Sequence, residues 1–290
     1  MHGYRVGEQV IYQQGKWARA RGLRRNSLTL EENLFQPLNA ETRADFEAGG
    51  LAELGSAGNP GRMQAVSSSS ALVCNVFDYW RSRFLRGESL AVLTNALGAP
   101  SPVKQMQFEQ AYRTGLGGTP PRLHVVLRSD EATPFLIETK FVGPGHDTGD
   151  VGTKDYFPNN GELWGKYGLP RCEALARRMY ADQEQFDRLD VLQLLNHILG
   201  AVNTFQKNFT LLYLWYDFPS YDAAGHRAEV ETFMLRLNGE IDFRSMTYQE
   251  LFKKIRVAPN VDEKYIAYLA ERYFYHSSGS EEMRINYFGY

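Results

Sequence analysis

The fold is decided by two short apolar runs, Arg122-Leu123-His124-Val125-Val126-Leu127 and Phe135-Leu136-Ile137-Glu138-Thr139-Lys140-Phe141. Both runs are rich in β-branched and aromatic residues, and a polar turn joins them, which predicts a β-hairpin. Because side chains alternate along a strand, Glu138 and Lys140 are expected on one face, with Ile137, Thr139 and Phe141 on the other. The hairpin therefore places a carboxylate and an ammonium group side by side.

The segments around the hairpin predict helices and one further strand. A serine among residues 67–70 can cap a helix over residues 71–80. Residues 108–112 are expected to end a helix, because glycines and prolines follow them. Residues 209–216 are typical of a strand buried on both faces, and helices are predicted over residues 170–180, 188–202, 224–238 and 259–273. This order predicts an α/β sandwich with a central mixed β-sheet flanked by helices.

Composition limits the class of protein. Hydrophobic residues make up 43% of the 290 residues and charged residues 23%, which is an ordinary globular balance. Residues 1–64 are expected to form a peripheral segment, partly basic and partly Gly-rich, and residues 65–290 the main domain. Cys74 and Cys172 are expected to be buried, reduced thiols of a cytoplasmic protein. No run of about 18 apolar residues occurs, so neither a membrane span nor secretion is predicted.

The Glu138-x-Lys140 pair has two explanations. One is an ordinary ion pair at an exposed strand edge, since this spacing is common by chance. The other is phosphodiester hydrolysis, in which a carboxylate holds a divalent cation and a lysine orients water or neutralises developing charge.

An ordered set of segments between about residues 65 and 275 resembles the PD-(D/E)xK nuclease superfamily, in particular a bacterial restriction-endonuclease-like branch. Besides the hairpin, the segments are Ser68-Ser69-Ser70-Ala71-Leu72, Leu169-Pro170-Arg171-Cys172-Glu173-Ala174-Leu175, Leu189-Asp190-Val191-Leu192-Gln193-Leu194-Leu195-Asn196-His197 and Glu271-Arg272-Tyr273-Phe274. The resemblance implies a restriction-endonuclease-like fold and metal-dependent hydrolysis of DNA. It assigns Glu138 and Lys140 to the Glu-x-Lys strand and Glu109 to the acid of a preceding helix.

His124 stands where this superfamily carries a metal-binding Asp. Glu138, Glu109 and His124 would then hold the metal ion, while Lys140 would assist the attacking water. Mg²⁺ prefers oxygen ligands, so an imidazole favours a softer ion such as Mn²⁺ or Zn²⁺. Four accounts of His124 stay open: an altered metal preference, a natural loss of activity, a substitution made to disable the enzyme, or a coincidental histidine in a protein that is not a nuclease.

A polar stripe runs along the helix predicted over residues 188–202. Asp190, Gln193 and His197 follow at i, i+3 and i+7, so they share one side of the helix. The resemblance places this helix beside the hairpin, where Gln193 would bind a phosphate oxygen or a water on the metal. The alternative is a solvated stripe, or polar groups satisfied by neighbouring backbone, and this explanation is preferred for His197.

The densest basic cluster consists of Lys16, Arg19, Arg21, Arg24 and Arg25 around Trp17. Because the chain carries 32 basic and 34 acidic residues, any binding of DNA, or of RNA, must come from such a local patch. The alternative is an ordinary solvated surface.

The sequence therefore predicts a metal-dependent nuclease that uses Mg²⁺ or Mn²⁺ on DNA, with homodimerisation expected if it cuts both strands. Two alternatives remain. One is a module of the same fold that binds nucleic acid or protein and has lost the chemistry. The other is a structural interaction protein with no affinity for nucleic acid.

Overall fold

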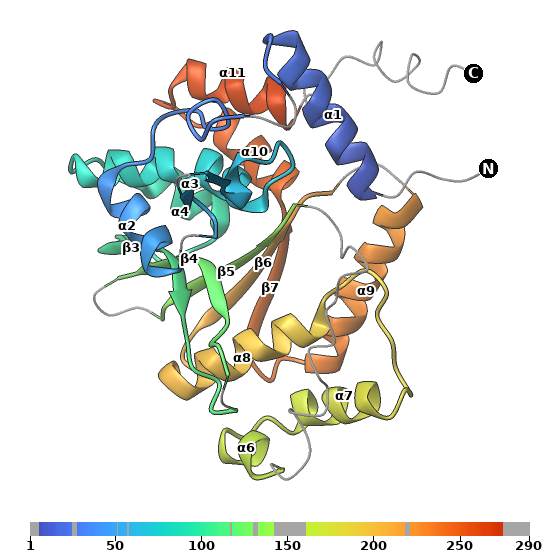
Figure 1. Ribbon diagram of the computed structural model, residues 1–290. Helices are drawn as coiled ribbons and strands as arrows, with labels where there is room; N and C mark the ends of the chain where they lie inside the picture. The colour runs from blue at the N-terminus through green and yellow to red at the C-terminus, as the bar shows by residue number, and fades with distance from the viewer. Residues whose placement is uncertain are drawn as a thin grey trace.

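The computed structural model describes residues 6–24, 28–50, 52–56, 58–116, 118–129, 133–141, 161–217 and 221–274. A mixed sheet runs through the middle of the molecule in the order β3-β4-β5-β6-β7, with helices on both sides (Figure 1). Its strands are β3 (Gln105–Ala111), β4 (Arg122–Arg128), β5 (Phe135–Lys140), β6 (Thr210–Trp215) and β7 (Asp242–Thr247). The predicted α/β sandwich with a central mixed sheet is confirmed.

The predicted hairpin forms the antiparallel half of the sheet. β4 pairs antiparallel with both β3 and β5, and Val125 lies opposite Ile137. β5, β6 and β7 are parallel, so that Glu138 lies beside Tyr213. β5 is therefore the central strand, and it is the strand at which the sheet changes from antiparallel to parallel pairing.

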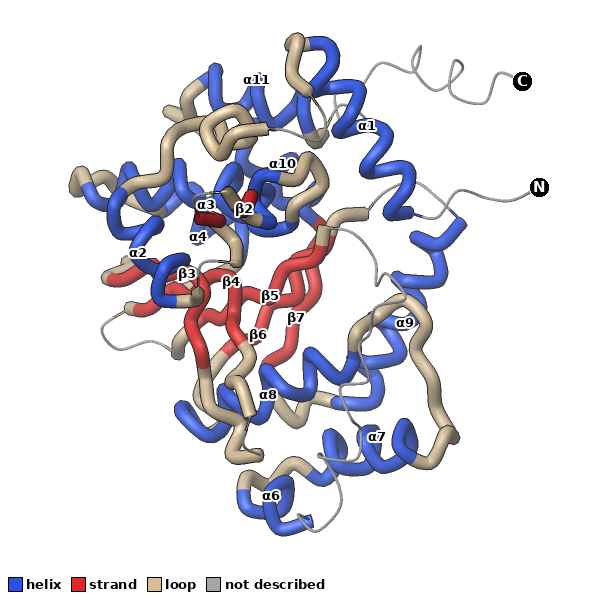
Figure 2. The backbone as a smooth tube through the Cα atoms, in the orientation of Figure 1, coloured by secondary structure: helices blue, strands red, loops and turns tan. Residues whose placement is uncertain are grey.

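Each face of the sheet has its own layer of helices (Figure 2). One layer contains α3 (Ser69–Leu85), α4 (Ala91–Leu97), α10 (Tyr248–Arg256) and α11 (Glu263–Arg272). The other contains α6 (Gly161–Lys166), α7 (Pro170–Tyr180), α8 (Val191–Phe205) and α9 (Tyr221–Leu237). β5 serves both layers, because Ile137 packs toward α3 and Leu136 toward α8.

The helix ends follow local sequence. The hydroxyl of Ser68 accepts a hydrogen bond from the backbone N–H of Ala71 and caps α3. The carboxylate of Asp190 caps α8 in the same way at Gln193. The helices predicted in these two places are confirmed, as are α7, α9 and α11 within a few residues at each end.

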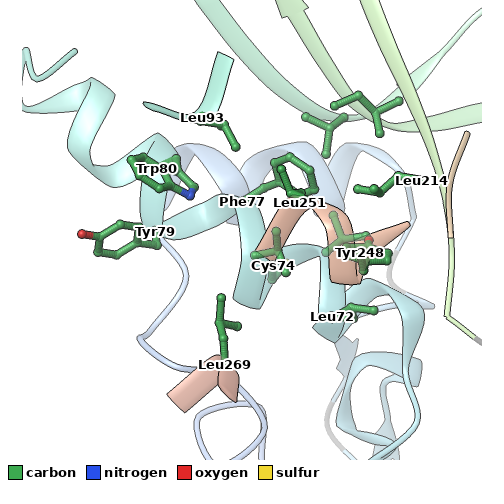
Figure 3. Packing of buried hydrophobic residues seen from close by; sticks show 14 of the residues in the cluster. Leu72, Cys74, Phe77, Tyr79, Trp80, Leu93, Leu214, Tyr248, Leu251 and Leu269 are labelled. Atoms are coloured by element: carbon green, nitrogen blue, oxygen red, sulfur yellow. The ribbon is translucent and has the colours of Figure 1, made fainter. Parts of the chain in front are cut away.

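The layer around α3 has a close-packed core that includes one of the two cysteines (Figure 3). Cys74 lies in this cluster, whereas Cys172 lies in the cluster on the opposite face, and both are buried thiols. The prediction that the two cysteines are buried and unpaired is confirmed. Among the described residues, no helix is long and apolar enough to cross a membrane.

The segment before residue 65 also contributes to the core. It contains α1 (Val6–Ala20), α2 (Ala40–Ala48), the short strands β1 (Gly55–Ser56) and β2 (Asn59–Pro60), and the turn η1 (Arg62–Gln64). Val10, Phe46 and Met63 are buried in the same cluster as α3. The domain boundary between residues 64 and 65 stays a prediction.

The prediction that residues 108–112 end a helix is wrong. Residues 108–111 belong to β3, in which Met106 and Phe108 are buried while Gln105 is exposed, and Tyr112 follows the strand. Buried and less buried positions alternate here with the period of a strand, and this pattern outweighs the helix-breaking residues that follow. Glu109 therefore stands on a strand, not on a helix.

A buried cation joins the two ends of the chain. Arg272 is 1% exposed, and its guanidinium donates to the backbone oxygen and side-chain oxygen of Asn33 and to Gln14 Oε1. It also lies 4.1 Å from the centre of the Trp17 ring. No carboxylate of the described residues pairs with it, so neutral oxygens and aromatic faces stabilise its charge.

We expect Arg272→Met to lower the free energy of unfolding by about 3 kcal/mol or more, because it leaves several buried acceptors without a donor. Urea denaturation measures the effect. Arg236→Met is the matched control, since Arg236 is an exposed side chain paired with Glu184, and we expect a loss under about 1 kcal/mol. Equal losses in the two variants would contradict this account of Arg272.

Candidate functional site

Glu138 is a buried carboxylate in the middle of the sheet. It is 2% exposed, and it points to the face covered by α8, because the neighbouring Ile137 points to the other. The described ladder between β4 and β5 runs no further than the Val125–Ile137 pair, one residue before Glu138. β5 has a strand on each side, and Glu138 is buried. The explanation of Glu138 and Lys140 as an ion pair at an exposed strand edge is therefore wrong.

His124 reaches Glu138 from the adjacent strand. Its Nδ1 lies 3.0 Å from Glu138 Oε2, and the backbone N–H of Thr139 lies 3.3 Å from the same nitrogen. A nitrogen that faces both a donor and a carboxylate oxygen cannot satisfy both with one lone pair. The shorter contact favours a protonated Nδ1 that donates to Glu138.

His197 reaches the same oxygen from α8. Its Nε2 lies 3.2 Å from Glu138 Oε2, and its side chain is 1% exposed. Within the described part of the chain, neither ring nitrogen has an aligned hydrogen-bond partner. The alternative in which neighbouring backbone satisfies His197 is therefore wrong, because no backbone group of the described residues bonds either nitrogen. Leaving a buried polar group without a hydrogen bond costs about 1–3 kcal/mol.

The two imidazoles determine the charge of Glu138. Burial alone would raise the pKa of this carboxyl, but the proximity of His124 and His197 holds it well below its ordinary value of 4.5. Burial alone would lower the pKa of His124, but Glu138 and Glu109 raise it from 6.5 to about 9. At neutral pH the site therefore contains an ionised carboxylate and an imidazolium in contact.

Glu109 lies in β3, next to the strand that carries His124. Its backbone adopts a φ of 51°, and it interrupts the register at the position opposite His124. Burial, with a further contribution from Glu138, raises the pKa of the Glu109 carboxyl. The structure thus brings Glu109 into the electrostatic neighbourhood of His124 and Glu138, although it places this acid on a different element from the one expected.

Lys140 and Gln193 lie beside this cluster. Lys140 follows Glu138 on the same face of β5, and its half-buried charge acts on both His124 and His226. Gln193 is half-buried in the first turn of α8, one turn before His197. Of the predicted helix stripe, His197 is the residue that contacts the hairpin, at Glu138.

The basic cluster lies elsewhere. α1 packs on α11, in the layer over the opposite face of the sheet (Figure 1). Trp17 is buried, and Arg21 forms a two-pronged ion pair with Glu271. Lys16, Arg19 and Arg24 are exposed, whereas Arg25 lies outside the described residues. Only part of the cluster thus presents charge to solvent, and its role in nucleic-acid binding stays a prediction.

Around Glu138, the groups that could bind a metal ion are its own carboxylate and the imidazoles of His124 and His197. Across the described residues, no three histidine, cysteine, aspartate or glutamate side chains already surround a space for a metal ion. His197 Nε2 has the Glu138 carboxylate as its ion-pair partner, whereas His197 Nδ1 has no hydrogen-bond partner among the described residues. Nitrogen and oxygen donors together fit Mn²⁺ or Zn²⁺ better than Mg²⁺.

We expect the metal-free protein to lose stability as the pH rises from 6.5 to about 9. A histidine whose pKa is raised by folding stabilises the protein fully below its unfolded pKa, and this contribution disappears as the pH passes the folded pKa. Glu138, whose pKa is lowered, contributes its full stabilisation above pH 4.5 and therefore adds no slope in this range. Urea denaturation across this pH range measures the decline.

His124→Asn removes this titration and should flatten the profile above pH 6.5. His226→Gln is the matched control. Burial, with Lys140 nearby, lowers the pKa of His226 to about 4, so this histidine is neutral throughout the range. A decline that survives in His124→Asn would contradict the assignment.

Comparisons with known proteins assign no family to this chain. No family model, no curated protein and no solved structure matches it. The site is therefore characterised by its own geometry: a buried carboxylate on the central strand, held between two imidazoles from a neighbouring strand and a crossing helix.

Proposed function

We propose that this protein is a nuclease of restriction-endonuclease-like fold that hydrolyses DNA phosphodiester bonds with a bound divalent metal ion. The observation that carries the proposal is the ionised, buried Glu138 on the central strand, with Lys140 on the same strand face. In support, the antiparallel partner β4 carries His124, whose imidazole contacts Glu138, and α8 brings His197 to the same carboxylate.

Each residue of the site has a distinct role in the proposed reaction. Glu138, His124 and His197 would hold the ion, with Glu109 adding negative charge nearby. When bound, the ion would supply an activated water and stabilise the negative charge that develops on the phosphate. Lys140 would orient that water or neutralise the same charge, and the amide of Gln193 would donate a hydrogen bond to a phosphate oxygen.

One observation favours a second candidate, a nucleic-acid-binding module of this fold without catalysis. His124 already neutralises Glu138 from within the protein, because the pKa of this histidine is raised to about 9. The carboxylate then needs no metal ion to compensate its charge. In this candidate the exposed Arg19 and Arg24 of the N-terminal segment contact the phosphates.

Cleavage of plasmid and single-stranded DNA in Mg²⁺ and in Mn²⁺ tests the nuclease. We expect faster cleavage in Mn²⁺, and at least about a hundredfold loss in Glu138→Gln, since the ion loses its charged ligand. His124→Asp should raise activity in Mg²⁺ by supplying an oxygen ligand, and the double variant His124→Asp, Glu138→Ala should be inactive.

Asp78→Asn is the matched control for loss of a buried carboxylate, because Asp78 lies on α3 and bonds Thr42 and Asn39. We expect this variant to cut at the rate of the unchanged chain once its folding is verified by circular dichroism. Cleavage by the double variant would show that Glu138 is not part of the active site.

DNA binding measured against salt concentration tests the second candidate. Reversing both charges, Arg19→Glu and Arg24→Glu, should weaken DNA binding. It should also reduce, by up to about two, the slope of the logarithm of the binding constant against the logarithm of salt concentration. Arg236→Glu, on the opposite layer, should leave binding unchanged. Binding without cleavage in any metal favours the module, whereas neither binding nor cleavage favours a protein that does not act on nucleic acid.

A further inference from the structure

His226 of α9 lies over the strand next to the one that carries Glu138 and Lys140. In the parallel pairing of β5 with β6, Glu138 is the register partner of Tyr213, and Lys140 is the register partner of Trp215. The side chains of register partners point to the same face of a sheet. The centre of the His226 ring lies 5.8 Å from that of Tyr213 and 4.5 Å from that of Trp215. The imidazole therefore stands on the face of the sheet to which Glu138 and Lys140 also point.

One hydrogen bond orients the His226 ring. Its Nε2 lies 3.1 Å from the hydroxyl of Tyr213, a buried side chain. Because a hydroxyl can donate or accept, this bond is kept whichever ring nitrogen carries the proton. Among the described residues, Nδ1 of His226 has no hydrogen-bond partner, and His226 is only half-buried. The second ring nitrogen is therefore left to bind a ligand.

Lys140 places a positive charge beside this imidazole. It is half-buried, and no carboxylate of the described residues forms an ion pair with it. The nearby carboxylate on the same strand, Glu138, is engaged instead by the imidazoles of His124 and His197. Partial burial of an ammonium group is unfavourable unless a partner compensates its charge. An anionic ligand would supply that partner.

The groups that face His226 from the neighbouring elements would not repel an anion. Burial, Lys140 from β5 and Arg188 from the segment before α8 lower the pKa of His226 to about 4. Tyr213 faces His226 from β6, and burial raises the pKa of this phenol well above its ordinary value of 10, so it is neutral. Glu229, one turn further along α9, is paired with Arg188 at 3.3 Å.

We propose that Lys140 and His226 together bind one phosphate group of a nucleic-acid strand. The ammonium group compensates the charge of the phosphate, and Nδ1–H of His226 donates a hydrogen bond to one of its oxygens. Tyr213 is the positioning residue, because its hydroxyl holds the imidazole in place. The inference rests on the proposed nuclease function, and it adds a substrate-binding residue from α9 to a site otherwise formed by β4, β5 and α8.

Sulfate, which has the tetrahedral shape of a phosphate group, tests the site without any reaction. In ¹⁵N NMR spectra of the chelator-treated full chain at pH 7, we expect the ring signals of His226 to shift with sulfate concentration and to saturate. Their absence in His226→Gln assigns them. Lys140→Met should weaken sulfate binding by at least about tenfold. Lys207→Met is the matched control, because Lys207 donates to the backbone oxygen of Gly168, and it should bind sulfate as the unchanged chain does.

A single-stranded DNA oligonucleotide tests whether the anion is a nucleic-acid phosphate. With metal ions removed by a chelator, the oligonucleotide should shift the same His226 signals. Fluorescence anisotropy should show binding at least about fivefold weaker in His226→Gln, with a smaller loss in Tyr213→Phe. In cleavage assays with metal, His226→Gln should raise KM more than it lowers kcat, because the hydrogen bond is made before the reaction as well as during it.

Each outcome decides between the proposals. His226 signals that do not respond to sulfate, or a response that survives in Lys140→Met, would overturn the inference. If sulfate shifts the signals but the oligonucleotide does not, the site binds a small oxyanion, and the assignment to nucleic acid is wrong. If both bind but no metal supports cleavage, the phosphate site stands and the nuclease function fails. If DNA is cut while His226 responds to neither probe, the nuclease function stands and the phosphate site fails.

Discussion

The structure depends on how one carboxylate is stabilised inside the sheet. An ionised side chain at the position of Glu138 loses several kcal/mol of hydration unless partners replace the water. The partners are His124 from β4 and His197 from α8, so the hairpin and the crossing helix are tied to a single oxygen atom. The contact adds to the apolar packing of α8 on this face of the sheet.

Glu138 and Arg272 show two different ways of stabilising a buried charge. On the α8 side a carboxylate is compensated by imidazoles, which can exchange a proton or bind an ion. On the α11 side the cation Arg272 is surrounded by amide oxygens and aromatic rings, none of which titrate near neutral pH. The first arrangement suits chemistry, and the second suits permanent structure.

Elements with a strong local pattern were predictable from the sequence. Clear periodicity, together with turn residues or caps, marks the hairpin, β6, α7 and α8. That Glu138 and Lys140 share one face of β5 follows from the alternation of side chains along a strand. β7 and α10 were not predicted, since the Asp242–Thr247 strand is half polar and owes its pairing to β6. The contact of His197 with Glu138 depends on how α8 crosses the sheet, and its sequence signal was only a histidine on a buried apolar helix, one turn after Gln193.

The contact between α1 and Arg272 also determines when the chain can finish folding. Gln14 and its partner on α11 are separated by 258 residues, so the first helix leaves the ribosome long before the side chain that covers its apolar face is synthesised. Until then α1 can contact only earlier residues, such as Leu28 and Val66 beside Trp17. The N-terminal helix therefore completes its packing only after α11 has been synthesised.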